Sequence, residues 1–192
     1  MADDHDRFSD AYRPPRSEFE PAIAFSAGQP YVVSPSKLTT LFVSTGGFFA
    51  VYWFYKHWDY VRRSQRSDIW PIARAVLAIF FINSLFRTID QAGRAAGGSP
   101  AWEPNGQAII YIVLLLGTRL LAQLGPYLGV GMLNLLSIGS SIVSVVPLLA
   151  AQRVVNQLAG DAAGRQNDSL TTPNVLFMVL GIMWWGVVLT RL

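Results

Sequence analysis

The sequence contains no cysteine and only two histidines, His5 and His57. Without cysteine the chain cannot form disulfides, iron–sulfur clusters or thiolate zinc sites. With only His5 and His57 present, one of them in the polar N-terminal stretch, the sequence argues against a histidine-rich metal centre or a haem-ligating pair. We therefore expect no metal ion and no cofactor.

Charge is also scarce. Charged residues make up 14% of the chain, against about 25% in a typical soluble domain. Hydrophobic residues make up 52%, and the mean hydropathy is +0.33. The charged residues gather in four stretches separated by long uncharged runs: 1–20, 56–74, 87–103 and 151–168. Because hydrocarbon excludes charge, this pattern predicts an integral membrane protein.

The apolar segments contain no Asp, Glu or His. Proton-coupled transporters use such residues inside the membrane, and intramembrane proteases need His/Glu or paired Asp residues there. The serines of these segments have no histidine or lysine in any predicted span to activate them as nucleophiles. The chain is therefore predicted not to be an enzyme. The small net charge of +3 is better explained by membrane topology than by nucleic-acid binding.

The uncharged runs predict an all-α fold, a polytopic membrane helix bundle with four or five transmembrane helices. Residues 1–37 are expected to form a polar, flexible and disordered tail without the apolar core of a signal peptide. The first apolar segment would then act as an uncleaved anchor. The bundle is expected to occupy residues 38–192. Its spans are predicted at 38–55, 106–124, 127–150 and 174–190, with a further segment at 69–87.

The segment at 69–87 has two interpretations. Asp68 can cap a helix that has Pro71 in its first turn. Arg74 interrupts the segment early, and the wholly apolar stretch 75–82 is too short to span. The helix either lies in the membrane interface with its basic side on headgroups, or spans while Arg74 snorkels. The bundle therefore has four spans or five.

Two features of the stretch after the first span predict its orientation. The aromatic residues between 52 and 60 are expected to lie at the headgroup level rather than in a core. Four basic residues follow the span, whereas only Lys37 lies shortly before it. The positive-inside rule therefore favours an external N-terminus and a cytoplasmic loop at 56–68.

Three sets of residues are candidates for function. Five basic side chains can contact anionic lipid or bind a small anion, although snorkelling and topology alone also explain them. They are Lys56, Arg62, Arg63, Arg74 and Arg119. Four serines form small-xxx-small pairs that allow close helix packing, within the chain or against a partner. They are Ser137, Ser140, Ser141 and Ser144.

Gln152 and Asn156 form the third set. They lie four residues apart on a predicted helix that continues past residue 150, so their side chains can hydrogen-bond to each other. They either mark a polar helix end at the headgroups or contact a loop or a partner.

The run YWFYK-x-W, at Tyr52–Lys56 with Trp58, closes the first predicted span. A segment that starts at Pro71 and has Arg74 three residues on follows it. Together with PLLAAQRVVNQL at Pro147–Leu158 and an asparagine-initiated last span, these sequences resemble an uncharacterised family of bacterial inner-membrane proteins.

The resemblance covers most of the chain after residue 30. It implies a location in the bacterial inner membrane, and it implies no activity. One departure from the family's sequence is Gly46-Gly47-Phe48, which should loosen the middle of the first span.

The sequence thus predicts a non-catalytic accessory, assembly or scaffold subunit. The alternative is a channel or carrier for a small solute, including an anionic solute near Arg119. The expected partners are membrane lipids and either a membrane-protein partner or a second copy of the chain.

Overall fold

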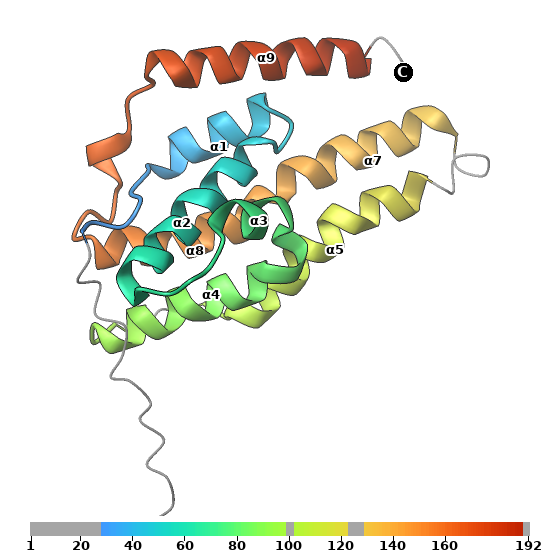
Figure 1. The fold of residues 1–192 in the computed structure, drawn as a ribbon. Coiled ribbons are helices and arrows are strands. Elements are labelled where there is room, and N and C mark those ends of the chain that lie inside the picture. The colour runs from blue at the N-terminus through green and yellow to red at the C-terminus, as the bar shows by residue number, and fades with distance from the viewer. Residues whose placement is uncertain (1–27, 99–101, 123–128, 190–192) are drawn as a thin grey trace, which may run out of the picture.

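The computed structural model describes residues 28–98, 102–122 and 129–189. Within these ranges the chain is helical and has no strand, which confirms the predicted all-α fold. Eight α-helices and one 3-10 helix are described (Figure 1): α1 (Pro35–Ser44), α2 (Phe49–Gln65), α3 (Pro71–Val76), α4 (Ala78–Ala95), α5 (Pro104–Ala122), α7 (Val130–Val143), α8 (Val145–Leu158), η1 (Arg165–Asn167) and α9 (Thr172–Leu189).

The last residues of the predicted N-terminal tail, 1–37, are folded against the helices. Its residues 1–27 lie outside the described part of the chain, but Val33 is fully buried. The Ser34 side chain caps α1 by accepting a hydrogen bond from the Lys37 N–H at 3.2 Å. The predicted tail boundary at residue 37 is therefore wrong, because Tyr31 to Lys37 belong to the folded structure.

The predicted first span, 38–55, is divided between two helices. α1 ends at Ser44, and Gly46 and Gly47 follow with φ angles of +59° and +89°. Two successive glycines in this conformation end a helix at little steric cost. α2 then returns toward the end of the molecule where α1 began (Figure 1). The prediction of one continuous helix is wrong, although the sequence did indicate a weakness at these glycines.

The aromatic residues of α2 form a core stripe, contrary to the prediction that they lie at a headgroup level. Trp53, Phe54, Trp58 and Tyr60 are buried, and only Tyr52 is substantially exposed. The buried residues recur at helical spacing along α2, which packs against α3 and α4. α2 also continues to Gln65, so most of the predicted loop at 56–68 is helical.

The segment predicted at 69–87 is two helices, α3 and α4, with a bend at Leu77. Trp70 holds the N-cap position of α3 and makes no side-chain capping bond, so the predicted Asp68 cap is wrong. α4 extends to Ala95, well into the predicted connection. Its apolar stripe continues through Ile89 and packs on α5 and α8, which explains the extra helical turns.

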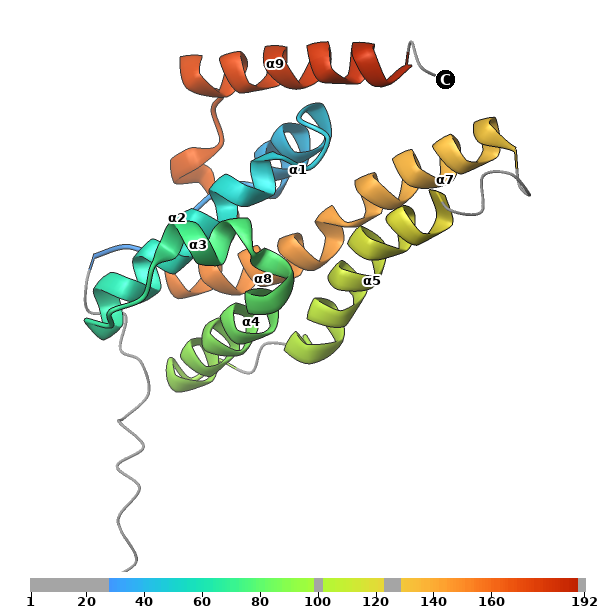
Figure 2. The ribbon, with the colours of Figure 1, turned by 45° about the vertical axis from the view of Figure 1, so that its right-hand side comes forward.

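The helices predicted at 106–124 and 127–150 are present as α5 and α7, which lie antiparallel and in contact (Figures 1 and 2). The turn at Gly125-Pro126 lies outside the described residues. The single helix predicted at 127–150 is divided, because α8 continues α7 only after a break at Ser144. Pro147 explains the break, since it has no N–H to donate to the carbonyl of Val143.

Taken together across the break at Ser144, α7 and α8 form a helical stretch, Gly131–Leu158, that is long and apolar enough to cross a membrane, by length and composition. Two shorter apolar helices, Pro104–Gly117 and Thr172–Val187, belong to α5 and α9. The last agrees closely with the segment predicted at 174–190. α9 packs mainly on α1, at the edge of the bundle (Figure 1).

Candidate functional site

A buried polar network centres on Gln152 in α8. Its Nε2 donates to the Tyr31 carbonyl at 3.0 Å and to Asn156 Oδ1 at 2.8 Å. Its Oε1 accepts from Trp53 Nε1 at 2.7 Å and lies 3.2 Å from His57 Nε2. Since Oε1 can only accept, His57 Nε2 carries the proton in this bond. All four hydrogen-bonding positions of the Gln152 amide are therefore used.

The network attaches the chain before α1 to α8. Asn156 Nδ2 donates to the Val33 carbonyl at 2.9 Å, next to the Gln152 bond to Tyr31. The predicted Gln152–Asn156 bond is thus confirmed. Both side chains have 0% exposure, so the reading as a polar helix end at the headgroups is wrong, and the contact is with a preceding loop.

His57 is buried within this network, with its ring centroid 4.1 Å from that of Trp53 and 5.9 Å from that of Tyr31. Among the described residues no group of three His, Cys, Asp or Glu side chains could hold a metal ion. The hydrogen bonds of the network hold α2, α8 and the segment before α1 together.

The basic candidates whose side chains are described make different contacts. The Arg74 guanidinium lies over the ring of Trp58, 4.5 Å from its centroid, and 5.1 Å from that of Phe81. Arg62 and Arg63 share the carboxylate of Asp59, at 2.8 and 3.2 Å.

The other two basic candidates are Lys56 and Arg119. Lys56 lies near the ring of Tyr31, with its Nζ 5.5 Å from the centroid. Arg119 is in α5, but its side chain falls outside the described part of the structure.

Two of the four candidate serines, Ser140 and Ser144, donate hydrogen bonds to backbone carbonyls of this chain. Ser140 Oγ donates to the Leu114 carbonyl of α5 at 3.0 Å, and Ser144 Oγ donates to the Ser141 carbonyl at 2.7 Å. The side chain of Ser137 is outside the description. Small side chains thus let α7 approach α5 within the chain, which favours the intrachain interpretation for Ser140.

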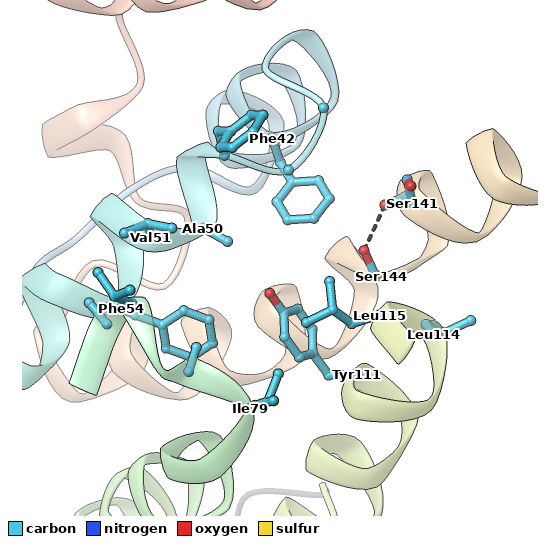
Figure 3. Close-up of a pocket in the computed structure, with 16 residues that line it drawn as sticks. Phe42, Ala50, Val51, Phe54, Ile79, Tyr111, Leu114, Leu115, Ser141 and Ser144 are labelled. Carbon is cyan, nitrogen blue, oxygen red and sulfur yellow. Dashed lines mark hydrogen bonds between the residues drawn. The ribbon is translucent and has the colours of Figure 1, made fainter. Parts of the chain in front are cut away.

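Ser141 and Ser144 also line a cavity of about 240 Å³ (Figure 3). The cavity lies between the turn after α1, the bend between α3 and α4, and the facing sides of α5 and α7. Most of its wall is apolar. The lining residues labelled in the figure are Phe42, Ala50, Val51, Phe54, Ile79, Tyr111, Leu114, Leu115, Ser141 and Ser144.

The cavity has few polar groups, and these come from separate helices. Tyr111 packs edge-on against Phe54, with ring centroids 5.8 Å apart, and its hydroxyl points into the space beside Phe42 (Figure 3). The broken backbone at Gly46 and Gly47 lines another side. None of the described residues that line the cavity is charged. Such a wall suits an uncharged, largely apolar occupant.

Sequence analysis missed the roles of Trp53, His57 and Tyr111. The helical spacing of the buried residues in α2 was a usable signal for the first two. Nothing in the sequence around Tyr111 indicated that it faces the turn after α1.

Comparisons with known proteins leave these sites without a relative. No family model, no curated protein and no solved structure matches the chain.

Proposed function

We propose that this chain is a multi-pass protein of the bacterial inner membrane with a non-catalytic role, as an accessory or assembly subunit. The observation that carries the proposal is the exposed apolar surface of α5, α7 and α9. Leu120, Leu135 and Leu180 are 70%, 73% and 65% exposed. Exposed apolar side chains in such number are expected where lipid or a protein partner covers the surface.

The uneven distribution of Lys and Arg between the two ends of the molecule supports one orientation in the membrane. The turn after α1 and the facing ends of α5 and α7 lie together on one side (Figure 1). The C-terminal ends of α2, α4 and α8 lie on the other, with Lys and Arg residues around them. The positive-inside rule assigns this basic end to the cytoplasm.

In this placement α5, α7 with α8, and α9 cross the membrane, while α1 and α2 enter and return. Irregular backbone at membrane depth needs cover from protein or a cavity. α9 provides such cover, because Trp185 Nε1 donates to the Val43 carbonyl at 2.9 Å. The cavity borders the other side of the same turn.

The cavity favours a protein partner that inserts side chains. A helix with its side chains is about 10 Å across, too wide for this space. One or two apolar side chains of a partner helix, or of a second copy of the chain, fit it. The surrounding lipid-facing helices would then carry the rest of the contact.

Two measurements test the proposal. The protein should stay in the membrane fraction after alkaline carbonate washing, and recovery in the supernatant would refute the membrane placement. In mild detergent, native mass measurement and cross-linking should find a specific complex. Ser141→Ala should retain it, and Ser141→Leu, which fills the cavity, should lose it. Ser64→Leu, the same change at the basic end, is the matched control.

A second candidate is a carrier or channel for a small neutral solute. It is favoured by the hydroxyls of Tyr111 and Ser141 together with broken backbone at the cavity wall, a combination found where transporters bind substrate. Among the described residues no cation lines the cavity, so the proposed solute is a neutral one. Faster swelling of proteoliposomes in glycerol or urea, abolished by Ser141→Leu, would support this candidate over the accessory role.

A further inference from the structure

A second pocket lies at the basic end of the molecule. It has a volume of about 240 Å³ and is bounded by the segment before α1, by α2 and by η1. Its wall carries Lys56 and Arg63 from α2 together with the amide side chains of Gln29, Gln166 and Asn167. None of the described residues that line it is a carboxylate. The two cations distinguish this pocket from the apolar cavity near Ser141.

The two cations share one face of α2. Lys56 and Arg63 are seven residues apart, which is close to two helical turns. Within the described residues Lys56 forms no ion pair, and its ammonium meets only the face of the Tyr31 ring. Arg63 uses Nε for Asp59, both for the carboxylate at 3.2 Å and for the backbone carbonyl at 3.3 Å. The terminal nitrogens of Arg63 remain available for a ligand.

The opposite wall of the pocket is held in place by buried and partly buried hydrogen bonds. The carbonyls of Tyr31, Val32 and Val33 accept from Gln152, Asn167 and Asn156, respectively. Asn167 Oδ1 also accepts from the Lys37 ammonium at 2.6 Å. The segment before α1 thus cannot fold into the pocket without breaking this set of bonds, so the space between it and Lys56 is preorganised.

We propose that this pocket binds a phosphate group, carried either by an anionic phospholipid headgroup or by free phosphate. Arg63 would donate two parallel bonds to phosphate oxygens, and Lys56 would act as a point charge. The amide N–H groups of Gln29 and Gln166 would donate to the remaining oxygens. The lipid source rests on the membrane placement proposed above, since it puts the basic end at the headgroups. Binding of free phosphate does not depend on that placement.

The test uses the purified full chain in an uncharged detergent and calorimetric titration with two probes. The first probe is inorganic phosphate. The second is phosphatidylglycerol in mixed micelles, compared with phosphatidylcholine at the same content. Lys56→Gln/Arg63→Gln should weaken binding by about tenfold or more, because it removes both charges of the pocket. Arg87→Gln/Arg153→Gln removes two exposed charges elsewhere and should leave affinity nearly unchanged.

A charge-preserving variant, Lys56→Arg/Arg63→Lys, separates lost binding from lost folding and should bind within a few-fold of the wild type. If only the binding of phosphatidylglycerol depends on Lys56 and Arg63, the ligand is a lipid headgroup. If only the binding of inorganic phosphate depends on them, the ligand is free phosphate. Absence of binding for both probes, or equal losses in the two glutamine pairs, would overturn the site. If carbonate washing releases the protein from the membrane fraction and the protein still binds inorganic phosphate in this pocket, the membrane placement is refuted and the phosphate site is not.

Discussion

The two ends of the molecule are built in different ways. At the basic end, Trp53, Trp58 and Phe86 are buried and the amide of Gln152 has all of its hydrogen bonds. At the other end, α5, α7 and α9 leave apolar side chains exposed around a cavity. The basic end is stabilised by burial within the chain, whereas the apolar end depends on its surroundings to cover it. Substitutions should therefore act differently at the two ends.

The largest effect is expected from Gln152→Ala at the basic end. It leaves the Trp53 and His57 N–H groups and the Tyr31 carbonyl buried without partners. Each such group costs about 1–3 kcal/mol, so the free energy of unfolding should fall by about 4 kcal/mol. Thermal or denaturant unfolding in detergent measures the loss. Gln157→Ala, at an exposed position of the same helix, should have little effect. Similar losses in both variants would mean that the network does not stabilise this end.

At the apolar end, Gly181→Ala should separate α9 from α1. A Cβ atom on Gly181 would overlap the backbone of Ser44 and Thr45, which cannot yield as a flexible side chain would. Overpacking of this kind costs about 1–3 kcal/mol. Gly186→Ala is the matched control in the same helix, because a Cβ there meets nothing within 4 Å. The melting temperature should fall for Gly181→Ala and stay level or rise for Gly186→Ala, where alanine is the better helix former.

The smallest effect is expected from Arg74→Lys. The guanidinium stacks over Trp58 and Phe81, and lysine cannot reproduce that planar contact. The loss should be about 1 kcal/mol in the free energy of unfolding. Arg87→Lys should change stability less, because Arg87 is exposed and stacks on no aromatic ring of the described residues. If both variants behave alike, Arg74 acts through its charge alone.

Prediction from sequence succeeded where neighbouring residues decide the outcome. The helices at 106–124 and 174–190 agree with α5 and α9 to within a few residues. The Gln152–Asn156 bond followed from their spacing of four residues. Prediction failed for the tail boundary, for the single helix at 38–55 and for the aromatic residues of α2. In each case a distant part of the chain supplied the partner that changed the result.

The sequence by itself determined that the described chain is helical. Long apolar runs offer the backbone few side-chain partners, and an α-helix makes its backbone hydrogen bonds within its own segment. It also determined that cysteine chemistry is excluded. Only the tertiary structure decided that α8 holds the segment before α1, and that Lys56 and Arg63 face a pocket closed by Asn167. Trp53 and Gln152 are 99 residues apart in the sequence, and Lys37 and Asn167 are 130 apart. Contacts at such separations leave no periodic signal in the sequence, because they depend on how whole helices pack.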